Sequence, residues 1–215
     1  MTAAGTFNAY LSGLTVGSNG YSSTTTDGLL DLSAVTNGTL DVSGTVKIGG
    51  GVGTTANGEI RLPAIPATAG NLFVGSTNSG AKGTLIMTGT VFAVTNGVIV
   101  DGPSVANKGR INVTVAGSPA GLDLGAAATL AVSQGVVNIT FQNPAPRYTP
   151  IYWGLRWQGD HVAELAALKA AAKLAWDASA ISDPRIRGAV TNFVENNVTY
   201  IGAHMPPRGA VLLVR

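Results

Sequence analysis

The sequence predicts a mainly β protein, a parallel β-solenoid (β-helix) closed by a small C-terminal α+β cap. Three observations favour this fold class. Glycine accounts for 29 of the 215 residues, a density that disfavours long helices. Short apolar segments recur after a glycine with apolar side chains at alternate positions, which is typical of strands with one buried face. The composition then changes abruptly near Pro146, where this pattern ends.

The glycine-led pattern defines the predicted strands. Each segment has a glycine, a spacer and apolar residues at every second position. Charged spacers such as Asp31, Lys47 and Arg61 belong on a solvent-facing side. Turn-forming Gly, Asn, Ser and Thr residues separate the segments. The eight segments are Gly28–Leu32, Gly38–Val42, Gly44–Ile48, Gly58–Leu62, Gly70–Val74, Gly83–Met87, Gly109–Val113 and Gly135–Ile139.

A longer repeat indicates stacked coils. The segment from Gly38 to Val46 is echoed from Gly83 to Val91, at an offset of 45 residues. This offset suits two coils of about 22 residues each, the scale of many solenoid repeats. Because the spacing is irregular elsewhere, a β-sandwich of many short strands is the structural alternative.

The chain divides into residues 1–146, the predicted solenoid, and residues 147–215, the predicted cap. The first part holds 24 of the 29 glycines, whereas the second holds all three tryptophans and both histidines. The final coil of a solenoid exposes an apolar cross-section and unpaired strand edges. We therefore expect residues 147–215 to cover that end.

The cap is predicted to contain one helix and one β-hairpin. Apolar residues at near-helical spacing predict a helix over Asp160–Asp177, with Lys169 and Lys173 facing away. The segments Ala189–Val194 and Val198–Ile201 flank a polar Glu-Asn-Asn turn and predict the hairpin.

Aromatic residues are concentrated in the cap. Their rings could stack on sugars, but Trp and Tyr are also suited to cover an open core end with their polar tips in water. We favour the covering role and keep a weaker carbohydrate or partner surface as the alternative. The residues concerned are Tyr148, Tyr152, Trp153, Trp157 and Trp176.

Composition excludes several functional classes. The formal net charge is only +2 and no stripe of Lys and Arg is present, so a nucleic-acid partner is not expected. The chain has no cysteine, which excludes disulfides and thiolate ligands. No apolar run approaches the roughly 18 residues of a membrane span. The residues after Met1 lack the basic start and apolar block of a secretory signal.

Motifs for catalysis or cofactors are weak. The segment Gly49–Gly53 is not followed by Lys and Ser or Thr, so it does not predict a phosphate-binding loop. His161 and His204 are too far apart in sequence for a local metal motif. We therefore predict no catalytic residue, no metal site and no cofactor.

One pair of carboxylates could meet in a stacked fold. Asp31 and Asp41 occupy equivalent positions of the repeat, and paired carboxylates are the machinery of glycosidases. Lys47 and Arg61 occupy other positions of the same kind. These cations favour a ladder of alternating charge over a catalytic pair.

The repeats and the cap together resemble a known class of bacterial proteins. The glycine-led array is followed by Tyr152–Val162, Leu174–Asp177 and Val198–Ile201. This combination resembles autotransporter-associated β-strand repeat proteins of the PEP-CTERM surface type. The resemblance implies an extracellular or cell-surface β-solenoid, and it carries over no catalytic residue.

We therefore expect a non-enzymatic structural or adhesive module of a bacterial cell-surface or secreted protein. A carbohydrate-binding or polysaccharide-degrading β-helix is one alternative. A phage fibre or another self-assembling structural protein is the other. The corresponding partners are a cell-surface polysaccharide or further copies of the chain.

Overall fold

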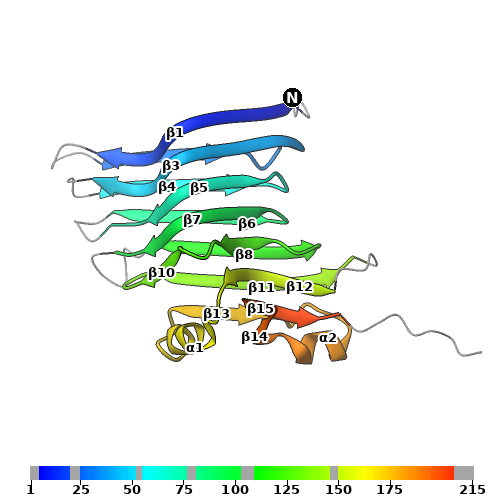
Figure 1. The fold of residues 1–215 in the computed structure, drawn as a ribbon. Coiled ribbons are helices and arrows are strands. Elements are labelled where there is room, and N and C mark those ends of the chain that lie inside the picture. Colours follow the sequence, from blue (N-terminus) through cyan, green and yellow to red (C-terminus); the bar gives the residue numbers. More distant parts are fainter. Residues whose placement is uncertain are drawn as a thin grey trace, which may run out of the picture.

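The computed structural model describes residues 5–19, 25–51, 55–76, 81–102, 109–145 and 150–205. In these residues the chain coils between two sheets, and successive coils stack along one axis (Figure 1). From β1 to β13, all strand pairs within each sheet are parallel. The predicted mainly β fold with a parallel β-solenoid is confirmed.

The strands of the two sheets alternate along the chain through most of the solenoid. In spatial order, sheet A consists of β1 (Thr6–Asn19), β3 (Asn37–Gly51), β5 (Ala67–Val74), β7 (Val91–Val100), β9 (Gly121–Leu124), β12 (Ile151–Gln158), β15 (Val198–His204) and β14 (Thr191–Glu195), with β10 (Thr129–Val132) also beside β7. Sheet B consists of β13 (Leu174–Asp177), β11 (Val136–Pro144), β8 (Arg110–Gly117), β6 (Lys82–Thr88), β4 (Thr55–Leu62) and β2 (Thr25–Asp31).

One coil is longer than the sequence pattern predicted. Asn57 in β4 pairs with Lys82 in β6, which is 25 residues further along the chain. Gly38 begins the pattern in β3 of sheet A, whereas Gly83 begins it in β6 of sheet B. The predicted coil of about 22 residues is therefore wrong. Because the glycine-led pattern occurs in both sheets, it recurs more often than once per coil.

Every second side chain points into the core between the sheets. In β6, Leu85 and Met87 are fully buried, while Thr84 and Ile86 are only partly buried. Across the core, Val46 and Ile48 of β3 are also fully buried. Each coil stacks its apolar residues on those of the next, so one continuous apolar cluster runs through the solenoid.

Glycines allow the two sheets to converge at one edge of the solenoid. At this glycine edge, Gly49 lies near the end of β3 and Gly75 directly follows β5. These two glycines have φ angles of +66° and +81°, values that favour glycine. Gly83, near the start of β6, lies against them: a Cβ there would be 2.1 Å from the Ile48 carbonyl oxygen and 2.2 Å from the Gly75 nitrogen. The repeated glycine thus permits close backbone approach.

Residues 150–205 continue both sheets and close one end of the solenoid (Figure 1). Strand β12 pairs with β9 in sheet A, and β13 pairs with β11 in sheet B. Two helices, α1 (Val162–Ala170) and α2 (Pro184–Ala189), lie at this end. Side chains from the helices and strands here are buried: Leu165, Leu174, Ile186 and Ile201.

The predicted single helix over Asp160–Asp177 is corrected in two respects. Helix α1 ends at Ala170, and Ala172 adopts a left-handed φ of +54° that stops helical propagation. The remaining residues, Leu174–Asp177, form strand β13 because pairing with β11 outweighs their helical spacing. The sequence also did not predict α2, which begins with Pro184 after an Asp183 side-chain cap.

The predicted hairpin is present as β14 and β15, which pair in antiparallel fashion. Its turn has two central residues, Asn196 and Asn197, with φ of +51° and +59°. Asparagine tolerates this conformation, which matches the twist of a tight hairpin. Among the described residues, no helix is long and apolar enough to cross a membrane.

Candidate functional site

Four of the five aromatic residues kept as a weaker candidate surface lie in the described residues, and these four do not share one exposed face. Tyr152 is fully buried and Trp157 is 4% exposed, so neither ring offers a face to a ligand. Trp153 and Trp176 are partly exposed but lie in β12 of sheet A and β13 of sheet B. Tyr148 lies outside the described residues. The two accessible tryptophans therefore belong to different sheets.

Tyr152 closes the core near the last coils. Its hydroxyl lies 2.8 Å from the carbonyl oxygen of Val115 and 3.0 Å from that of Gln142. Its ring meets Phe141 edge-on, with 5.8 Å between the ring centroids. Burial raises the pKa of Tyr152 to about 12. The side chain thus has a structural role that joins β12 to β8 and β11.

Replacing Tyr152 with phenylalanine is expected to destabilise the fold by about 1–2 kcal/mol at pH 7, because the buried Val115 carbonyl loses its hydroxyl donor. The native tyrosine loses its stabilising effect as the pH rises from 10 through about 12. The variant lacks the ionisable group and should lose less stability over this range. Urea unfolding at pH 7 and above pH 10 measures both effects, and equal alkaline losses would contradict the assignment.

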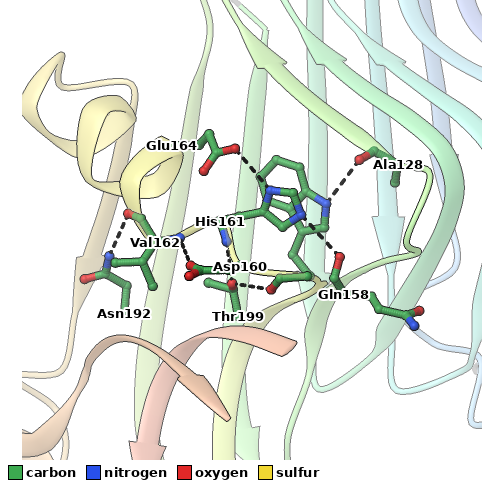
Figure 2. Close-up of polar contacts among 10 residues, drawn as sticks. Ala128, Gln158, Asp160, His161, Val162, Glu164, Asn192 and Thr199 are labelled. Atoms are coloured by element: carbon green, nitrogen blue, oxygen red, sulfur yellow. Dashed lines mark hydrogen bonds and ion pairs between the residues drawn. The ribbon is translucent and has the colours of Figure 1, made fainter. Parts of the chain in front are cut away.

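Trp157 packs on His161, the residue at the start of α1, and Figure 2 shows His161 with its polar partners. Their rings are stacked with centroids 3.7 Å apart. The indole nitrogen of Trp157 donates to the Ala128 carbonyl oxygen at 3.1 Å, and Nδ1 of His161 lies 3.3 Å from Glu164 Oε1. The Thr199 hydroxyl accepts from the His161 backbone nitrogen at 2.8 Å. These contacts fix the start of α1 against β15.

Trp176 also makes an intramolecular contact. The Lys169 ammonium lies 3.5 Å from the centroid of its ring, a cation–π contact between α1 and β13. Trp153 pairs in register with Gly202 of β15. A side chain at Gly202 would lie 2.9 Å from Trp153 Cα. Both tryptophans are therefore built into the cap, with only part of each ring accessible.

Outward polar side chains form inter-coil contacts, and each of these joins residues that face one another on adjacent strands. Arg61 Nη1 lies 3.0 Å from Asp31 Oδ2, and Arg156 Nη1 lies 2.8 Å from Asp123 Oδ2. Hydrogen bonds from Ser33, followed by the charge of Arg61, lower the pKa of Asp31. Further inter-coil contacts join Asp27 to Asn57, Asp41 to Thr68 and Asn112 to Asn138.

Asp31 and Asp41, considered in the sequence as a possible carboxylate pair and judged less favoured than a charge ladder, do not meet in the structure. Asp31 lies in β2 of sheet B and Asp41 in β3 of sheet A. Each carboxylate instead contacts a residue of the next strand in its own sheet, Arg61 and Thr68 respectively. Of the expected ladder of alternating charge, the structure shows the single pair Asp31–Arg61, which links neighbouring coils; the next residue in that register row is Ile86.

The described surface has a hollow of about 390 Å³ on the outer face of sheet B. Asp27, Asn57 and Lys82 cross it in one register row from β2 to β6. Asn57 donates to Asp27 at 2.7 Å, while its Oδ1 is buried and has no described partner. Leu29 adds an apolar surface that is 59% exposed. The hollow therefore combines charged, amide and apolar groups.

This hollow could not be found by scanning for motifs. Asp27, Asn57 and Lys82 are separated by 30 and 25 residues in the sequence, and only the strand register brings them together. The signal that could have found them is alignment of the glycines that follow them, at positions 28, 58 and 83.

The two histidines have separate local partners. His161 contacts Glu164, and His204 Nε2 lies 3.5 Å from Glu195 Oε2. No group of three or more His, Asp or Glu residues suited to a metal ion occurs in the described part of the chain.

Comparison with known proteins finds no match to a family model, to a curated protein or to a solved structure. The resemblance to PEP-CTERM surface proteins therefore stays a prediction.

Proposed function

We propose that the chain is a non-enzymatic structural module of a bacterial cell-surface or secreted protein, in which stacked coils act as a spacer. The inter-coil contacts carry this proposal. In each of them, a polar side chain of one coil is held by the residue at the same register position of the next. These polar contacts on the outer faces thus stabilise the stacking of the coils, as expected for a spacer whose role depends on its length.

The proposal predicts that a whole coil can be removed. Deleting residues 57–81 joins Ala56 to Lys82, which occupies the register position of Asn57. Strand β3 would then face β7, because β5 is in register with both. We expect a cooperatively folded chain shortened by about 4.8 Å along the axis, measured by small-angle scattering and thermal melting.

A deletion that breaks the register is the matched control. Removing residues 57–69 takes away about half a coil and should abolish cooperative melting. On a bacterial surface, the full and coil-deleted chains should both present a terminal epitope. Antibody access to this epitope should increase with the number of coils. Loss of presentation by the folded coil deletion would contradict a spacer role.

Carbohydrate binding is a second candidate function, favoured by the hollow on sheet B. A glycan laid along the solenoid axis would meet Asp27, Asn57 and Lys82 in succession, about 4.8 Å apart. Screening the full chain on a glycan array tests this function. A hit that survives replacement of both Asp27 and Lys82 by alanine would argue against the hollow as its site.

A further inference from the structure

The core is open at the first coil. Leu11 of β1 is in register with Val42 of β3. Val42 is 1% exposed, whereas Leu11 is 38% exposed. Leu30 of β2 is likewise only partly buried, while its register partner Ile60 is 1% exposed. Core-facing positions that are buried in the second coil thus remain solvent-accessible in the first coil, because no described coil covers them.

The strand at this end has one unpaired edge in the described part of the chain. Strand β1 ends sheet A, and among the described residues no strand lies on its far side. Its 14 residues, Thr6–Asn19, include no charged side chain and no proline. Edge strands normally carry such residues to prevent pairing with another chain. Strand β1 lacks these safeguards.

Exposed apolar side chains gather at the same end. The large apolar residues of the described surface that are most exposed include Tyr10 at 73% and Leu29 at 59%, on β1 and β2. Tyr10 is in register with the outward Asp41 of sheet A, and Leu29 lines the hollow on the outer face of sheet B. Of Tyr10, Leu11 and Leu29, only Leu11 therefore faces the open core end. This surface therefore offers backbone hydrogen-bonding groups and apolar area together, the combination that a pairing strand recognises.

The opposite end of the molecule is closed. Leu165 and Ile201 are fully buried there, and Leu174 is 1% exposed. A second copy therefore presents an open core only at its own first coil. A head-to-head contact covers both open ends at once, whereas a head-to-tail contact leaves one open end on the assembly.

We propose that two copies of this chain associate through their first coils, with β1 of one antiparallel to β1 of the other. A two-fold axis makes this contact self-complementary and closed. Since β1 is uncharged, the seam brings no like charges together there. The carboxylates of β2 face outward, where Asn57 and Arg61 hold Asp27 and Asp31. The inference goes beyond the spacer role and does not depend on it.

Sedimentation or light scattering of the full chain across a wide concentration range tests the proposal. We expect a species of twice the 21.7 kDa chain mass. Leu11→Lys places a charge in the open core end, and Tyr10→Lys places one beside the seam. Each should raise the dimer dissociation constant at least about tenfold. Thr88→Lys, an equal charge change at an exposed position of the internal strand β6, should leave it unchanged.

The absence of native cysteine permits a second measurement. Single cysteines at Asn8, Tyr10 and Ser12 in turn should give a disulfide-linked dimer on oxidation from at least one position near the axis. Thr88→Cys should not. A monomer at every concentration, an open-ended filament, or a dimer insensitive to both lysine variants of β1 would overturn the proposal.

Discussion

A fragment that ends at Pro146 is expected to aggregate rather than fold as a monodisperse species. Leu155 of β12 pairs with Leu122 of β9, and Leu174 of β13 pairs with Val137 of β11. All four side chains are at most 1% exposed in the full chain. Truncation would expose the apolar cross-section and the edges of both sheets at once.

Size-exclusion chromatography with light scattering measures this result. The matched control ends at Met205, which retains all described strands and helices and should remain monodisperse. A fragment 1–146 that melts cooperatively and elutes as a defined species would show that the solenoid does not need the cap.

Gly83→Ala is expected to destabilise the fold by about 3 kcal/mol or more, the upper range for forced overpacking. The new methyl group would overlap the backbone of two neighbouring strand ends, at Ile48 and Gly75. Backbone atoms cannot rotate away as a flexible side chain can. The glycine edge would therefore have to separate locally.

Gly50→Ala is the matched control for this substitution. Gly50 lies near the same edge, but a Cβ there has nothing within 4 Å. Its free energy of unfolding should change by less than about 1 kcal/mol. Chemical denaturation of both variants gives the comparison, and similar stabilities would show that the sheets do not converge as closely as described.

Period-two alternation made the strands predictable, because burial follows it directly in segments such as Leu85–Met87. The hairpin was also predictable, since Asn196 and Asn197 belong to the few residues that tolerate its turn. In both cases the determining physics is local to a few neighbouring residues.

Features that depend on register between coils were not predictable in the same way. Nothing in the sequence around Asp31 and Asp41 assigns one to sheet B and the other to sheet A. Trp157 and Trp176 each follow a leucine by two residues, yet Trp157 is buried and Trp176 is partly exposed. Tertiary pairing likewise overrode the helical spacing of Trp176, which pairs with Ile139 of β11.

The parallel pairing of successive coils also determines how the molecule would respond to tension. Ladder hydrogen bonds run across the strands and therefore along the solenoid axis, so pulling on the two ends loads the ladders between successive coils in series. Each coil that detaches would replace a rise of about 4.8 Å with up to about 85 Å of extended chain for a 25-residue coil. The solenoid would thus lengthen in discrete steps and dissipate mechanical work while the remaining coils stay folded.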